Sequence, residues 1–216
     1  LPAFETVVTR EQPWTVMCAY NSVWGQPACA RDLLLKDHLR GDWGFKGYVV
    51  SDCDAVTDIS IHHKYAPDPA AAVAAAFKAG VDNECNTQTL SDTPGLGARY
   101  KEAYERGLLG MNDIDRALVR LFSARFRNGD LPGVRADAPV PVSAINTPEH
   151  QALALKAAIE SLVLLKNDGV LPFKANARIA VIGPLADATR VLRGNYSSPA
   201  SAPPISVLAG LRQAMP

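Results

Sequence analysis

The stretch Trp43-Gly-Phe-Lys-Gly-Tyr-Val-Val-Ser-Asp-Cys-Asp-Ala-Val56 contains a short apolar run that leads directly into two carboxylates. Residues 48–51 are rich in β-branched side chains and follow a glycine, which is typical of a strand buried in a parallel sheet. Asp52 therefore falls at or just past the carboxyl end of this strand, where a β/α barrel carries its chemistry. The alternative is that Asp52 only caps the turn that follows. The next periodic helix is expected only from Pro69.

Strands and helices are expected to alternate over the first part of the chain. Pro69 suits the first turn of its helix, and Asn112 is the expected cap of the last helix in this part. The predicted strands cover 15–19, 48–51 and 80–84, and the predicted helices cover 28–39, 69–79, 96–108 and 112–127. This alternation is typical of parallel β/α units. The predicted fold class is therefore α/β.

The composition changes after residue 128. Residues 129–147 contain several prolines and little hydrophobic periodicity, as in a linker between domains. A helix is expected to open at Thr147-Pro148, and two strands are expected over 162–166 and 178–183. The sequence thus predicts a second unit over 148–216.

Charge and hydropathy exclude several classes of protein. The 22 basic and 22 acidic side chains give a net charge of zero, without runs of one sign. This balance argues against nucleic acid or an anionic membrane as the main partner. No apolar stretch approaches the roughly 20 residues that a membrane-spanning helix needs. The opening residues Leu1-Pro-Ala-Phe lack the charged and apolar regions of a signal peptide.

We expect neither a metal nor a cofactor. The four cysteines, at positions 18, 29, 53 and 85, lack the paired spacing of a zinc site. The sequence permits one disulfide among them, close to the strand ends, without requiring it. The cysteines alone do not indicate in which cellular compartment the protein resides. The adjacent His62 and His63 would not point the same way on a helix or strand. A solvated loop is the better interpretation of that pair.

A set of short motifs runs through the chain in a fixed order. They are Leu1-Pro-Ala-Phe-Glu5, Val16-Met-Cys-Ala-Tyr-Asn21, Gly25-Gln-Pro-Ala-Cys29, Leu39-Arg-Gly-Asp-Trp-Gly-Phe45, Gly47-Tyr-Val-Val-Ser-Asp-Cys-Asp54, Ala79-Gly-Val-Asp82, Ser161-Leu-Val-Leu-Leu-Lys-Asn-Asp-Gly169, Leu171-Pro172, Ala180-Val-Ile-Gly-Pro184 and Gly194-Asn-Tyr196. Each is weak alone, but together and in register they are specific. Through them the chain resembles glycoside hydrolase family 3, the retaining exo-acting β-glycosidases.

The resemblance implies roles for two residues. The aspartate of the family's Ser-Asp motif is the catalytic nucleophile, which corresponds to Asp52. Tyr20 matches a family tyrosine near the nucleophile, where a phenol can hydrogen-bond a carboxylate and lower its pKa. The alternative for Tyr20 is a partly buried tyrosine with one satisfied hydroxyl group. The implied substrate is a small carbohydrate.

The resemblance also implies an architecture. Residues 1–128 correspond to the last three β/α units of a (β/α)8, TIM-like barrel, 129–147 to a linker and 148–216 to the beginning of an α/β sandwich domain. A complete barrel needs about 250 residues. We therefore expect this chain to be a fragment that lacks the early barrel strands and the acid/base residue, a glutamate late in the second domain. The parent protein is expected to be an enzyme and the isolated piece to be inactive.

The remaining acidic residues have weaker interpretations. Asp54 is expected to cap its loop, although contact with substrate is an alternative. Asp82 and Glu84 end the third predicted strand, so they are expected at the same mouth as Asp52. The family usually shows Asp-Cys-Gly after its first aspartate there, which this chain replaces with Asn83-Glu-Cys-Asn86. The Asn195-Tyr-Ser197 triplet matches a glycosylation acceptor, but the family motif explains it as a loop near the cleft.

The identity of the substrate sugar is the property that the sequence constrains least. Cys53 after the nucleophile resembles the β-xylosidase and α-L-arabinofuranosidase branch, whereas many β-glucosidases of the family have tryptophan at that position. Some chains with Ser-Asp-Cys resemble β-glucosidases as well, so the resemblance implies a β-xylosidase or a β-glucosidase acting on plant-type oligosaccharides. A residue beside the nucleophile shapes the pocket around the sugar's C5 substituent, so this change can tune pentose against hexose. The parent is expected to be secreted or periplasmic. The alternative function is a non-catalytic carbohydrate-binding remnant, or a partial product that never folds.

Overall fold

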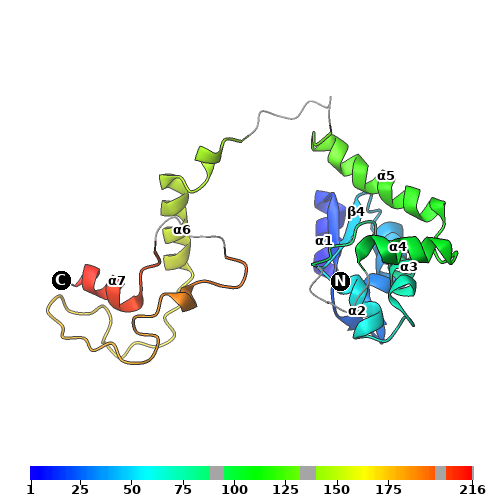
Figure 1. Ribbon diagram of the computed structural model, residues 1–216. Helices are drawn as coiled ribbons and strands as arrows, with labels where there is room; N and C mark the ends of the chain where they lie inside the picture. The colour runs from blue at the N-terminus through cyan, green and yellow to red at the C-terminus, as the bar shows by residue number, and fades with distance from the viewer. Residues whose placement is uncertain (88–94, 132–139, 198–202, 216) are drawn as a thin grey trace. The chain divides into compact units, whose positions relative to one another are not determined.

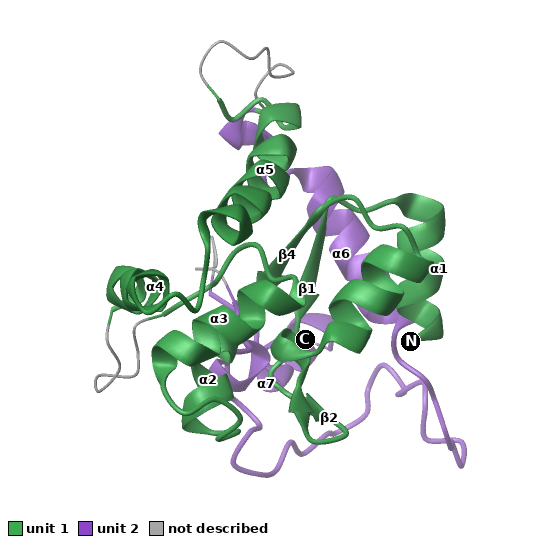
Figure 2. Ribbon diagram, turned by 90° about the vertical axis from the view of Figure 1, so that its right-hand side faces the viewer, with its two compact units in different colours: residues 1–140 green, residues 141–216 purple. Residues whose placement is uncertain are grey.

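The computed structural model describes residues 1–87, 95–131, 140–197 and 203–215 (Figure 1). Its contacts divide the chain into two compact units, Leu1–Val140 and Pro141–Pro216 (Figure 2). The division falls inside the segment 129–147 that the sequence indicated as a linker. Unit 1 contains both parallel strands and helices, so its class is α/β. No helix in the described part of the chain is long and apolar enough to cross a membrane.

Two parallel strands form the centre of unit 1. Strand β1 (Thr15–Cys18) pairs with β4 (Tyr48–Ser51), and the register runs from Thr15 opposite Tyr48 to Cys18 opposite Ser51 (Figure 2). Both strands were predicted, and both are confirmed. The register places the carboxyl ends of the two strands side by side.

The third predicted strand, over 80–84, is reduced to an isolated bridge between Val50 and Asn83. The carbonyl of Val49 accepts from the amides of both Asp82 and Asn83, while the amide of Val49 donates to the Asp82 side chain at 2.9 Å. A side chain thus takes the place of a backbone partner, which interrupts the ladder. The predicted strand is therefore wrong as a regular element, although the segment does lie beside β4.

The helix predicted over 28–39 forms as two shorter irregular elements. A 3₁₀ turn, η1 (Ala28–Ala30), precedes the wider π-helix η2 (Leu33–Asp42). The amide of Trp43 donates to the carbonyl of His38, five residues back, at 2.9 Å. This longer spacing between donor and acceptor is the π-helical pattern.

The helices α2 (Ala55–Ile61) and α3 (Pro69–Ala79) supply much of the core. Helix α3 has the predicted bounds, and the Asp68 side chain caps it by accepting from the amide of Ala71 at 2.8 Å. Helix α2 was not predicted. It packs against α3 and buries Val56 and Ile59 completely.

Other local features differ from the sequence prediction. Helix α4 (Leu96–Glu105) is shorter than expected, and α5 (Met111–Arg127) is capped at Gly110, whose amide donates to Asp113, rather than at Asn112. Helix α1 (Pro2–Glu11) and the antiparallel hairpin of β2 (Ser22–Val23) and β3 (Gln26–Pro27) were not predicted.

Unit 2 is helical where it is regular. Helix α6 (Pro148–Glu160) begins as predicted, with the Thr147 side chain accepting from the amide of His150. The same unit also contains the short 3₁₀ helices η3 (Val142–Ala144) and η4 (Arg190–Leu192) and the helix α7 (Val207–Ala214). The strands predicted over 162–166 and 178–183 are wrong: neither segment pairs with another in the described part of the chain. A strand is stabilised by its hydrogen-bonded neighbours, and these segments have none there.

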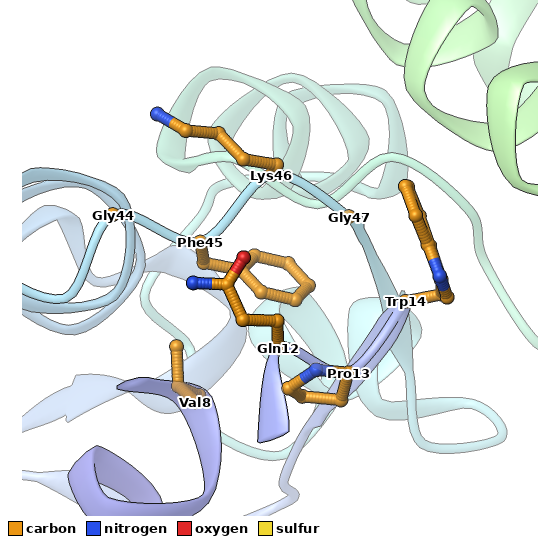
Figure 3. A pocket seen from close by; sticks show the side chains of 8 residues that line it. All are labelled: Val8, Gln12, Pro13, Trp14, Gly44, Phe45, Lys46 and Gly47. Atoms are coloured by element: carbon orange, nitrogen blue, oxygen red, sulfur yellow. The ribbon is translucent and has the colours of Figure 1, made fainter. Parts of the chain in front are cut away.

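The backbone segments that precede β1 and β4 approach each other closely at the amino ends of the two strands. A pocket there is lined by residues that include Trp14, Phe45 and Gly47 (Figure 3). The amide of Tyr48 donates to the Trp14 carbonyl at 3.0 Å, and a Cβ atom placed on Gly47 would lie 2.2 Å from that carbonyl oxygen. Only glycine permits this approach. The pocket lies at the opposite ends of the strands from Asp52.

Gly47→Ala should therefore destabilise the fold. The added methyl group overlaps the backbone that begins the β1–β4 ladder, so the free energy of unfolding of the whole protein should fall by about 1–3 kcal/mol. Gly97→Ala is the matched control, because nothing lies within 4 Å of the added Cβ on the exposed side of α4. That change should stabilise by about 0.5–1 kcal/mol. Urea unfolding checks both values, and equal stabilities would contradict the close approach.

Candidate functional site

Asp52 lies at the carboxyl end of the parallel pair. Its amide donates to the carbonyl of Cys18, the last residue of β1, at 2.9 Å, so the residue continues the ladder by one step. One carboxylate oxygen accepts from the amide of Cys53 at 2.8 Å. The other makes no hydrogen bond within the described residues, and the side chain is half-buried. This geometry holds a carboxylate in place and leaves one oxygen able to meet a ligand.

Two disulfides brace the same end of the strands. Cys18 is bonded to Cys29, and Cys53 is bonded to Cys85, with Cα–Cα distances of 5.2 and 4.3 Å. The sequence left one disulfide open, whereas the structure pairs all four cysteines. One bond fixes the end of β1, and the other joins the residue after Asp52 to the segment beside β4. No group of three or more potential metal ligands occurs within the part of the chain that the structure describes.

Tyr20 lies beside Asp52, but its hydroxyl has a different partner from the one expected. It donates to the backbone carbonyl of Cys53 rather than to a carboxylate. The carbonyl of Tyr20 in turn lies 2.7 Å from Nε2 of His63. The residue as a whole is 45% exposed. Tyr20 therefore supports the peptide that follows Asp52 and presents part of its ring to solvent.

His62 and His63 each contact another residue of the protein rather than only solvent. His62 contacts Asp58 on its own helix at 2.5 Å, while His63 reaches across to Tyr20. The interpretation of both as merely solvated was therefore incomplete. No local sequence signal indicated this contact, because the two partners are 43 residues apart.

Asp54 fastens one loop to another. It adopts a left-handed backbone conformation with φ of 69°, and its amide donates to the carbonyl of Cys85 at 2.8 Å. Its carboxylate accepts from both the amide and the hydroxyl of Thr87. Asp54 therefore has a structural partner for each carboxylate oxygen, as a loop-capping role requires.

Glu84 is buried and does not reach the mouth near Asp52, which corrects the prediction. Its side chain is 1% exposed, and its oxygens lie 2.8 Å from the Arg99 guanidinium and 3.0 Å from the Tyr100 hydroxyl. Arg99 also donates to the hydroxyl of Thr57 at 3.2 Å. Burial raises the pKa of the Glu84 carboxyl, and Arg99 opposes that rise. These partners hold Glu84 inside the core of unit 1.

Asp82 is also a core residue, and its placement at the mouth was likewise wrong. Its carboxylate accepts from Arg40 at 2.6 Å, from Arg120 at 3.0 Å and from the amide of Val49. Burial raises the pKa of Asp82, and its hydrogen bonds and the two guanidinium groups oppose the rise. Arg40 also donates to the carbonyl of Gly47, before β4, so this cluster lies toward the amino ends of the strands.

Family models match both parts of the chain. The Glycosyl hydrolase family 3 N terminal domain matches residues 1–124, and the Glycosyl hydrolase family 3 C-terminal domain matches residues 162–216. The first match alone covers more than half of the sequence.

Similar proteins include a probable exo-1,4-beta-xylosidase of Aspergillus clavatus, 42% identical over 204 residues, and probable beta-D-xylosidase 7 of Arabidopsis thaliana, 41% identical over 204 residues. Each alignment covers 92% of this chain but 26% of the relative, so the chain spans about a quarter of their length. A solved GH3 exo-beta-xylosidase in complex with a xylobiose aziridine probe is 36% identical, with a TM-score of 0.84 over 99% of this chain and 27% of its own. A beta-glucosidase involved in saponin metabolism from intestinal bacteria is 35% identical, with a TM-score of 0.80 over 99% of this chain and 29% of its own.

The Glu84–Arg99 pair should be a determinant of stability. Glu84→Gln leaves the Arg99 charge buried without its carboxylate, so the free energy of unfolding of the whole protein should fall by about 3–5 kcal/mol. Glu105→Gln is the control, because Glu105 forms an exposed pair with Lys101 at 3.6 Å and should change stability by less than about 1 kcal/mol. Denaturant unfolding of both variants gives the comparison. Similar losses would show that the buried pair contributes no more than a surface pair.

Proposed function

The chain belongs to glycoside hydrolase family 3, and from this membership we propose that the whole protein is a retaining, exo-acting β-glycosidase. The observation that carries the proposal is the position of Asp52, at the carboxyl end of β4 with one oxygen held by the Cys53 amide. The catalytic carboxylate of a barrel enzyme is expected at such a strand end. Curated and solved relatives named as xylosidases and glucosidases support the same reaction class.

In this mechanism Asp52 is the nucleophile. One carboxylate oxygen attacks the anomeric carbon, the bond to the leaving oxygen breaks, and a covalent glycosyl-enzyme intermediate forms that water then hydrolyses. The hydrogen bond from the Cys53 amide holds one carboxylate oxygen in place before attack. Tyr20 contributes by holding the Cys53 peptide, and its exposed part lines the sugar site.

A retaining glycosidase needs a second carboxyl group about 5 Å from the nucleophile to protonate the leaving oxygen. Glu84 is unsuited to that role, because Arg99 and Tyr100 occupy its oxygens inside the core. Asp54 is also unsuited, because Thr87 engages both of its oxygens. We therefore assign the acid/base role to a glutamate of the second domain beyond this sequence, as the family resemblance implies.

We propose that the sugar is β-xylose in preference to β-glucose. The Cys53–Cys85 disulfide stands directly beside Asp52, where many glucosidases of the family carry a tryptophan. Bonding to Cys85 fixes the position of the Cys53 side chain, so it can restrict the space around the sugar's C5 substituent. The curated relatives named as xylosidases favour this choice, whereas solved relatives named as β-glucosidases keep the hexose alternative open. Comparing kcat/KM for matched β-xylosides and β-glucosides decides between them.

The proposed architecture follows the family resemblance. Residues 1–128 are the last three β/α units of a (β/α)8 barrel, and residues 148–216 begin an α/β sandwich domain. The parallel β1–β4 pair and the two family matches support this assignment. The protein is expected in a secreted or periplasmic compartment, because two disulfides are typical of oxidising surroundings. A structure of the whole protein tests the architecture directly.

Asp52→Asn in the whole protein should abolish most turnover. The amide keeps the shape of the side chain but loses the charge that attacks the anomeric carbon, so kcat/KM on an aryl β-xyloside should fall by about 10³-fold or more. Asp54→Asn is the matched control, since asparagine retains one oxygen for Thr87, and it should cost much less. Equal losses in the two variants would show that the wrong carboxylate was assigned.

The isolated 216-residue chain serves as the negative control in the same assay. It lacks the assigned acid, which is worth about 10²–10⁴-fold, and the early-strand contacts that hold the sugar for attack. It should therefore be inactive, and its apolar strand edges should make it poorly soluble. Activity in this chain that disappears with Asp52→Asn would contradict the assignment of the acid. Carbohydrate binding without turnover by the whole protein would favour the non-catalytic alternative, and failure of the whole protein to fold would favour the partial-product alternative.

A further inference from the structure

The β2–β3 hairpin has an unusual residue at its turn. The strands pair Ser22 with Pro27 and Val23 with Gln26, which leaves Trp24 and Gly25 as a two-residue loop. Both loop residues have positive φ, 50° for Trp24 and 80° for Gly25. This is the turn geometry that favours Asn-Gly or Asp-Gly, and a bulky side chain in the left-handed region is strained. The hairpin alone does not require a tryptophan there.

The indole of Trp24 is exposed and held in place. The residue is 83% exposed, the highest value among the tryptophans described. The Arg31 guanidinium stacks over the ring, 4.9 Å from its centre, and Arg31 is itself buried with a hydrogen bond to the carbonyl of Val23. Within the described residues no carboxylate pairs with Arg31. The arginine therefore covers one face of the indole, and the other face meets solvent.

The hairpin is fastened to the surroundings of Asp52. It begins two residues after Tyr20, whose hydroxyl donates to the carbonyl of Cys53. On the other strand, the Gln26 side chain donates to the Tyr65 hydroxyl at 2.9 Å. Tyr65 follows His63, which contacts the carbonyl of Tyr20. Figure 2 shows β2 at the same end of unit 1 as α2, the helix that follows Asp52.

We propose that Trp24 is a stacking platform for a sugar unit on the leaving-group side of the bond that Asp52 attacks. This inference rests on the proposed glycosidase function. The face of an aromatic ring carries partial negative charge, so it attracts the weakly positive C–H groups along one face of a sugar ring. Because Arg31 already fixes the indole, binding costs little side-chain entropy.

The platform belongs to the leaving group and not to the sugar under attack. The attacked sugar must contact Asp52 and its neighbours, whereas Trp24 stands at the outer tip of a hairpin anchored next to them. Gln26 and Tyr65 add polar groups beside the platform that can bond sugar hydroxyls. The strain at Trp24 is consistent with a residue retained for binding, because strained backbone persists at functional sites. The predicted ligand is therefore an oligosaccharide of at least two units.

The test uses the whole protein with Asp52→Asn as a background that binds without turnover. Isothermal titration with xylotriose should give a Kd that rises about five- to tenfold on Trp24→Asn, the range expected for one aromatic contact. Asparagine suits the turn, so the variant should keep or raise the melting temperature. Trp24→Phe should recover part of the affinity. An unchanged Kd would overturn the proposal. If the melting temperature also fell, the result would mean that Trp24 packs against another part of the protein instead of binding sugar.

Kinetics with Asp52 intact separate this proposal from the proposed function. β-Xylosyl fluoride has a leaving group too small to reach Trp24, so Trp24→Asn should leave its kcat/KM within about twofold while lowering kcat/KM for xylotriose about five- to tenfold. Equal losses on the two substrates would contradict the leaving-group placement. Absence of hydrolysis of either substrate by the unmodified protein would instead contradict the proposed function, and the titration would still report on the platform.

Discussion

The parallel register of β1 and β4 is the constraint on which the candidate site depends. It brings Cys18 opposite Ser51, and the Asp52 amide then bonds the Cys18 carbonyl as the next step of the ladder. A shift of one residue would move Asp52 to the other face of the pair. The close approach of Gly47 to Trp14 fixes this register at the amino ends, and the two disulfides fix the carboxyl ends. The carboxylate is thus held by backbone and covalent bonds rather than by flexible side chains.

The acidic residues near the strands divide into two kinds. Asp82 and Glu84 are buried against arginines and connect the segment beside β4 to η2, α4 and α5. Arginine charges and hydrogen bonds replace the water that burial removes from these two carboxyl groups. Asp52 is half-buried and has one oxygen without a hydrogen bond among the described residues. The role of each carboxylate is therefore set by its partners: Asp82 and Glu84 stabilise the core, and Asp52 is left for a ligand.

The sequence predicted the elements whose signals are local. The β-branched run 48–51 and the start of α3 at Pro69 were found because the strand and helix-start signals lie within a few residues of each other, whereas the Asp68 cap was not predicted. Pairings over long distances were not found: Arg99 reaches Glu84 from a separate helix, and the spacing of the cysteines did not indicate which of them bond. Helix α2 is only seven residues long and gave no periodic signal. The strands expected over 162–166 and 178–183 have the right composition, but strand formation also requires neighbours.

The central claim is that Asp52 is the nucleophile, and chemical trapping tests it most directly. A 2-deoxy-2-fluoro-β-xyloside with a good leaving group should form a stable ester on the whole protein. The fluorine slows both formation and hydrolysis of the glycosyl intermediate, and the good leaving group restores only the rate of formation. Peptide mapping by mass spectrometry then locates the sugar. The account predicts a single label on Asp52. A label on Asp54 or on any other residue would contradict it.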